Sequence, residues 1–135
     1  MTAFQTVLKL FAVVIAIVAG LHIAFGTKSE ILLGARWPQG AALDATIDSQ
    51  DRFYGAAFLV YGCLLWFCGG DLRRYAPVLK TMFAVFFFAG LARFVSFAQV
   101  GTPSPMIIFL WALEIVSPPV LWFWMSRRMR QQHMA

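Results

Sequence analysis

Four long apolar stretches, separated by short polar segments, set the pattern of this chain. They lie at residues 4–25, 53–69, 77–97 and 105–125. A helix needs about 20 residues to cross the hydrocarbon core of a bilayer, and about 17 is near the lower limit. The short second stretch is expected to begin a turn earlier, at Asp48, or to thin the bilayer locally. The pattern predicts an all-α integral membrane four-helix bundle, with residues 1–135 forming one transmembrane domain.

The loop between the first two spans carries signals for local structure. Thr27 and Glu30 have the spacing of a capping box and precede an apolar run, which predicts a short interfacial helix. Trp37 would anchor the far side of the loop at headgroup level. Asp48 would cap the second span, and Asp51 would favour the positive end of that helix. The alternative is a solvated loop whose acidic residues only cap a helix.

Composition supports a membrane protein, because 61% of the residues are apolar and 13% are charged, against about 45–50% and about 25% in soluble domains. The net charge is +5, with basic residues gathered at Arg73-Arg74 and in the tail at residues 126–134. This distribution indicates that the basic residues determine membrane topology and contact anionic lipid, rather than forming a nucleic-acid-binding surface. The positive-inside rule places both termini in the cytoplasm and residues 26–52 outside, in a bacterial inner membrane.

Two charged residues lie deep within the predicted spans, Arg93 in the third and Glu114 in the fourth, whereas Lys9 and Lys80 lie near span ends. A charge near the centre of a membrane helix costs about 2.5–3.5 kcal/mol, and such residues usually pair inside the bundle and mark a functional site. The third span runs outward and the fourth inward, while side chains lean toward their helix N-terminus. Arg93 and Glu114 are therefore expected to meet in the outer third of the membrane, where His22 also converges.

The neighbours of this pair complete a candidate ligand site. Ser96 lies three residues from Arg93 on the third span, and Trp111 lies three residues from Glu114 on the fourth. Pro118 and Pro119 remove backbone donors and predict a kink just below Glu114. The candidate ligand-binding residues are Arg93, Glu114, His22, Arg52, Ser96, Trp111 and Tyr54.

Other interpretations of the same cluster stay open. The charges could form a buried structural ion pair that fixes helix order, because a buried pair is weak evidence for function. They could also line a proton or ion pathway. One histidine and one acid from distant helices do not make a metal-ligand set, and His133 lies at the opposite side of the membrane from His22. The sequence therefore indicates neither a metal site nor a haem or other cofactor.

Several short motifs resemble a known family. They are Ser49-Gln-Asp-Arg52-Phe-Tyr-Gly55, Leu91-Ala-Arg93-Phe-Val-Ser96, Gly101-Thr-Pro103 and the acid Glu114. In this order they resemble the small bacterial four-span membrane proteins grouped as the domain-of-unknown-function family numbered 4345, over roughly the last two-thirds of the chain. The resemblance implies a four-helix bundle and points to Arg52, Arg93 and Glu114. It implies no activity.

Three classes of function fit these features. The first is a non-enzymatic protein that binds a membrane lipid or a small amphipathic molecule between its helices, with Arg93 and Arg52 holding an acidic headgroup. The second is a small dimeric transporter that uses Glu114 as a proton-coupled acid. The third is a membrane isomerase resembling the four-helix sterol isomerases, with Glu114 and His22 as acid and base. The sequence favours the first class, and leaves open whether the chain acts alone, as a homodimer or as an accessory subunit of a larger membrane complex.

Overall fold

The computed structural model describes residues 2–38 and 40–131, and all of its regular elements are helices. His133 of the tail lies outside these residues. The elements are α1 (Ala3–Phe25), α2 (Thr27–Leu32), α3 (Ala45–Cys68), α4 (Ala76–Val100) and α5 (Pro105–Gln131). The all-α class is thus as the sequence predicts. The helix α5 passes through Pro118 and Pro119 without interruption.

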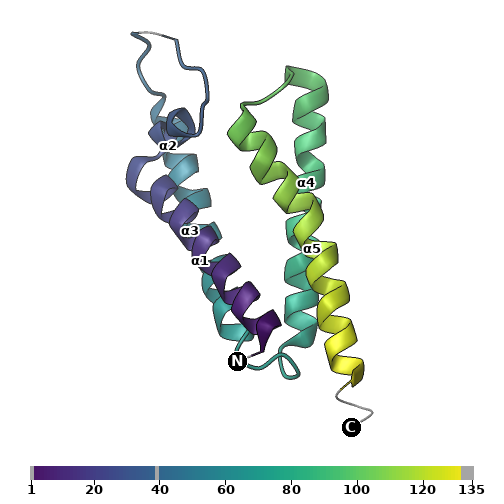
Figure 1. Cartoon of the computed structure of the whole chain (residues 1–135). Helices are drawn as coiled ribbons and strands as arrows, with labels where there is room; N and C mark the ends of the chain where they lie inside the picture. Colours follow the sequence, from purple (N-terminus) through teal and green to yellow (C-terminus); the bar gives the residue numbers. More distant parts are fainter. Residues whose placement is uncertain (1, 39, 132–135) are drawn as a thin grey trace.

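The four long helices form two antiparallel pairs, as Figure 1 shows. The helix α1 packs chiefly on α3, and α4 packs on α5, with fewer contacts between the pairs. Gly55 permits the first pairing, because a Cβ at this position would lie 2.8 Å from the His22 Cβ and 3.0 Å from the Ala19 carbonyl oxygen. Gly90 does the same for the second pair, facing Glu114 and Ile115.

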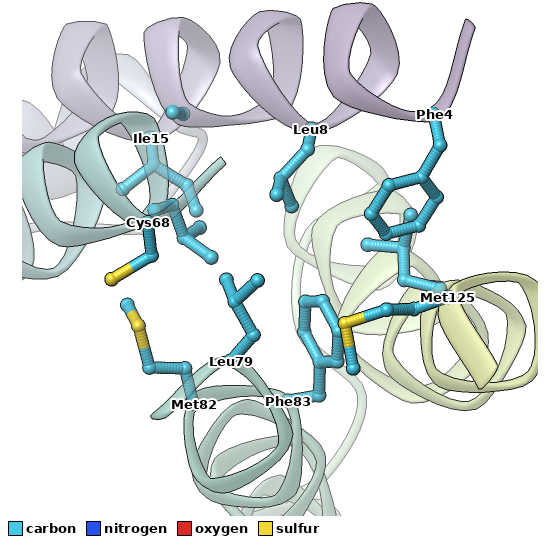
Figure 2. Close-up of a cluster of buried hydrophobic side chains, with 11 residues drawn as sticks. Phe4, Leu8, Ile15, Cys68, Leu79, Met82, Phe83 and Met125 are labelled. Carbon is cyan, nitrogen blue, oxygen red and sulfur yellow. The ribbon is translucent and has the colours of Figure 1, made fainter. Parts of the chain in front are cut away.

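The two pairs meet at one end of the molecule, where α1 and α4 begin and α3 and α5 end (Figure 1). Side chains from all four helices form a hydrophobic core there, and Figure 2 shows them converging. Gln5 reinforces this end by donating hydrogen bonds to the carbonyls of Gly69 and Gly70, at 3.0 and 3.2 Å. The core residues are Phe4, Leu8, Ala12, Ile15, Leu65, Cys68, Leu79, Met82, Phe83, Leu121 and Met125.

Three of the helices, α1, α4 and α5, are long and apolar enough to cross a membrane. Their outer faces are strongly apolar: Leu10 is 61% exposed, Phe88 66% and Phe123 69%. Apolar surface of this extent needs a bilayer or a partner to cover it. The helix α3 is of similar length but does not reach the same hydropathy, and its first two turns carry Asp48, Asp51 and Arg52.

The helix α2 is the short helix expected after the first span, but its caps differ from the prediction. Thr27 is the first residue of α2 rather than its N-cap. The N-cap is Gly26, and no side chain forms a capping hydrogen bond there. Instead, Asp48 of α3 accepts a hydrogen bond from the Thr27 amide at 3.0 Å. The helix α3 begins earlier than expected, at Ala45, and Asp44 caps it by accepting from the amides of Thr46 and Ile47. Because Asp44 caps α3, Asp48 can bind the Thr27 amide and so join α2 to α3. Local capping patterns in the sequence do not predict a contact between residues so far apart.

Candidate functional site

A cavity of about 550 Å³ is lined by residues of both helix pairs and by Glu30 of α2. Its lining comes from all five helices and the residue that follows α2. Four aromatic side chains, Phe11, Phe58, Tyr61 and Phe86, line one part of it, and the last three stack with centroid separations of 5.6–6.1 Å. Its polar lining comes from His22, Glu30, Asp51, Tyr54, Arg93 and Glu114. The cavity thus combines a wide apolar surface with a group of charged side chains.

Arg93 and Glu114 meet in this cavity. The Arg93 guanidinium donates two hydrogen bonds to the Glu114 carboxylate, from Nε at 2.6 Å and from an η nitrogen at 2.9 Å. The Glu114 side chain is 10% exposed and the Arg93 side chain 43%. A bidentate pair of this kind fixes the relative orientation of both groups. It also cancels most of the charge that each would present to a ligand.

Packing around this pair holds Glu114 close to α4. The indole of Trp111 donates to the Gly90 carbonyl at 2.7 Å, and its ring stacks edge-on against Phe94 with centroids 4.3 Å apart. A Cβ on Gly90 would lie 3.1 Å from the Glu114 Cβ. Trp111 does not line the cavity. It therefore positions the pair from the side, by joining α5 to α4.

His22 lies beside two acids that the sequence did not connect with it. Ligand atoms of His22, Glu30 and Asp51 all lie within 4.8 Å of one another. The His22 Nδ1 is 3.8 Å from a Glu30 carboxylate oxygen and 2.9 Å from the Ser29 hydroxyl. The three residues come from α1, α2 and α3, and all three line the cavity. This grouping exists because α2 folds back over α1.

Besides Trp111, two candidate residues lie away from the cavity lining, Arg52 and Ser96. Arg52 donates to Asp48 at 2.8 Å and to the carbonyls of Ile23 and Ala24 at 2.7 and 3.2 Å. It therefore caps the end of α1, where free carbonyls carry the negative end of the helix dipole. Ser96 is exposed and does not line the cavity.

The loop that joins α4 to α5 contacts the segment after α2 at Leu33, a residue that lines the cavity. The Ser104 hydroxyl donates to the Leu33 carbonyl at 2.7 Å, and so ties this loop to the segment after α2. At the opposite end of the cavity, the Tyr61 hydroxyl donates to the Met82 carbonyl at 2.7 Å. These two hydrogen bonds connect the helix pairs on either side of the cavity. They limit how far the pairs can separate.

Comparison with known proteins gives a family. The model of the family described as "Domain of unknown function (DUF4345)" matches residues 3–125. The chain belongs to this family. The match confirms the resemblance in the motifs around Arg52, Arg93 and Glu114, and it extends over α1, which those motifs do not include. No curated protein and no solved structure shows significant similarity to the chain.

Proposed function

We propose that this protein binds a membrane lipid or another small amphipathic molecule in the cavity between its helix pairs. The observation that carries the proposal is the division of the lining into an aromatic part, formed by Phe11, Phe58, Tyr61 and Phe86, and a charged part around Arg93 and Glu114. Ligand sites are typically apolar cavities of about 300–1,000 Å³ with a few convergent polar groups. An acyl or ring system would pack on the aromatic side chains while its headgroup faces the charged pair.

The contacts of the charged pair favour a headgroup without net charge. Arg93 is already neutralised by Glu114, and Arg52, which the sequence offered as a second cation, is engaged at the end of α1. An acidic headgroup would therefore have to compete with Glu114 for the same guanidinium. A neutral or zwitterionic headgroup can donate to Glu114 and accept from Arg93 without breaking the pair.

Filling the cavity should strongly weaken ligand binding without disturbing the core. Ala57 lines the cavity, whereas the neighbouring Ala56 does not. We expect Ala57→Phe to reduce the amount of copurifying amphipathic molecule by at least about tenfold, equivalent to about 1.4 kcal/mol of binding free energy. Native mass spectrometry and lipid analysis of the protein purified in mild detergent measure this directly. Ala56→Phe is the matched control, and equal ligand content in the two variants would contradict the proposal.

We also propose that α3 is a fourth span, with both chain termini in the cytoplasm of a bacterium. The helix α3 packs along most of α1, which is itself apolar enough to cross a membrane. The Arg73-Arg74 turn and the basic end of α5 lie at the same end of the molecule, which supports a common cytoplasmic side.

Thiol labelling of intact cells tests this orientation. In a variant without the native Cys63 and Cys68, cysteine at Ser126 or Gln131 should be protected from a membrane-impermeant reagent. Cysteine at Ala42, in the loop before α3, should react. Labelling of the α5 end from outside would reverse the orientation, and labelling of both ends would remove α3 as a span.

An isomerase remains the second candidate, because one observation favours it. Such an enzyme needs more than one acid in its pocket, and the cavity is lined by Glu30, Asp51 and Glu114 together with His22. These groups could exchange a proton with a bound unsaturated ring system. Deuterium entering the bound molecule from heavy water would distinguish an isomerase from a binding protein.

A further inference from the structure

We propose that His22, Glu30 and Asp51 form a binding site for a divalent transition-metal ion of the zinc class. This site would lie in the wall of the cavity, and it does not depend on the amphipathic ligand proposed above. The three residues are far apart in the sequence but contribute one imidazole and two carboxylates to one place.

The spacing of the three side chains suits a metal. Their ligand atoms lie within 4.8 Å of one another. Around a tetrahedral zinc, with ligands at about 2.1 Å, neighbouring donor atoms are about 3.4 Å apart. Small rotamer changes would therefore bring the three side chains onto one ion. Because each residue comes from a different helix, binding would also fasten α2 against α1 and α3.

The second, independent observation is an unsatisfied carboxylate oxygen. One oxygen of Asp51, Oδ2, is buried and has no hydrogen-bond partner among the residues that the structure describes. A buried polar atom without a partner destabilises the fold, and more so when it is charged. The adjacent Glu30 carboxylate adds repulsion between like charges. A bound cation removes both penalties, since it coordinates the oxygen and neutralises the pair of acids.

Ser29 prepares the imidazole for coordination. Its hydroxyl donates to the Gly26 carbonyl at 2.7 Å and also lies 2.9 Å from the His22 Nδ1. A hydroxyl has one hydrogen, so when that hydrogen points to Gly26 the His22 Nδ1 must be the donor to Ser29. The other ring nitrogen, Nε2, then carries the free lone pair. Metal-binding histidines are commonly held by a hydrogen bond to the ring nitrogen that does not bind the metal. Here the held nitrogen, Nδ1, is also the one 3.8 Å from a Glu30 carboxylate oxygen, so a rotation of the imidazole is part of the proposed coordination through Nε2.

The donor set selects the class of ion. Magnesium and calcium prefer sites made entirely of oxygen, whereas imidazole suits zinc and its transition-metal neighbours. Three protein ligands leave a fourth coordination position for water or another molecule, as in catalytic rather than structural zinc sites. Because the same three residues line the cavity, this position could be filled by a group of the molecule bound there.

Zinc binding by the purified protein tests the site. The protein should carry an affinity tag without histidines, with Cys63, Cys68 and His133 replaced so that no other thiol or imidazole competes. After removal of metal with a chelator and titration with zinc alone, we expect about one zinc per chain by elemental analysis and calorimetry. Cobalt in place of zinc should give the visible absorption of a four- or five-coordinate centre.

Three variants and one control decide the result. His22→Gln, Asp51→Asn and Glu30→Gln should each weaken zinc binding by at least about tenfold. Glu30 lies on a short surface helix with a side chain 38% exposed, so its variant should fold even if the others do not. Asp44→Asn is the control, because asparagine also caps helices well and Asp44 lies outside the group. Unchanged zinc binding in Glu30→Gln, or no zinc binding by the parent protein, would overturn the proposal.

Ala57→Phe separates this inference from the proposed function. The substitution fills the cavity through a residue that is not part of the three-residue group. The Ala57→Phe variant should therefore bind zinc as the parent does, even when it no longer binds the amphipathic ligand. Loss of zinc binding in this variant would contradict a metal site that is independent of the ligand.

Discussion

Replacing Gly55 by alanine should lower the stability of the folded protein by about 1–3 kcal/mol, the usual cost of forcing extra atoms into a packed interior. The new Cβ would lie 2.8 Å from the His22 Cβ and 3.0 Å from backbone atoms of Ala19 and Ile23. Backbone atoms cannot move aside as a flexible side chain can, so α1 and α3 would have to separate. This interface is the most extensive in the molecule. Thermal unfolding in detergent, followed by circular dichroism, measures the loss.

Gly20→Ala is the matched control for this experiment. Gly20 lies on α1, and a Cβ there would meet nothing within 4 Å. Alanine favours a helix over glycine by about 1 kcal/mol, so this variant should be as stable as the parent or slightly more stable. If Gly55→Ala were equally stable, the close packing of α1 on α3 would be wrong.

The same substitution should affect the cavity, because Gly55 supports His22. Moving α1 away from α3 would shift His22 relative to Asp51, which lies one helical turn before Gly55 on α3. Zinc binding should then weaken in Gly55→Ala even at temperatures where the protein remains folded. Fold and site are linked here through one close contact between helices.

The helices and the meeting of Arg93 with Glu114 could be predicted because both depend on regular geometry. Span length is set by the bilayer, and the depth of each charge follows from the rise per residue of a helix. The position of Ser96 shows the limit of this reasoning. Residues three apart in a helix differ by about 300° around its axis, which is about 60° short of a full turn. Each further step of three therefore moves the side chain about 60° away from the face of the first residue. Gly90 faces α5, Arg93 lies at the edge of the contact, and Ser96 has turned out of it.

The group of His22, Glu30 and Asp51 could not be predicted, because it depends on how a non-regular segment folds back. Local patterns assigned Glu30 and Asp51 to helix ends, where acids are common. The position of α2 is instead fixed by Asp48, which binds the Thr27 amide 21 residues away. Arg52 adds bonds to carbonyls of α1. Only a signal connecting these distant residues would have revealed the group.

Removing one member of the Arg93–Glu114 pair should destabilise the protein, while removing both should not. Glu114→Gln leaves Arg93 without its counter-charge, and breaking a buried pair in this way costs about 3–5 kcal/mol. Partial exposure of Arg93 places the expected loss near the lower value, about 3 kcal/mol. In the double variant with Arg93→Met and Glu114→Leu no charge remains, so thermal stability in detergent should return to that of the parent.

The double variant also separates scaffold from binding site. If the pair serves only to fix helix order, the variant should keep every molecule that copurifies with the parent. If the pair receives a headgroup, the variant should fold normally and lose that molecule, because the apolar replacements offer neither donor nor acceptor. We expect the second result, with intact zinc binding at His22, Glu30 and Asp51 as an internal check on the fold. A stable double variant that retains its full ligand content would assign Arg93 and Glu114 to structure alone, and the headgroup would have to be sought elsewhere along the cavity.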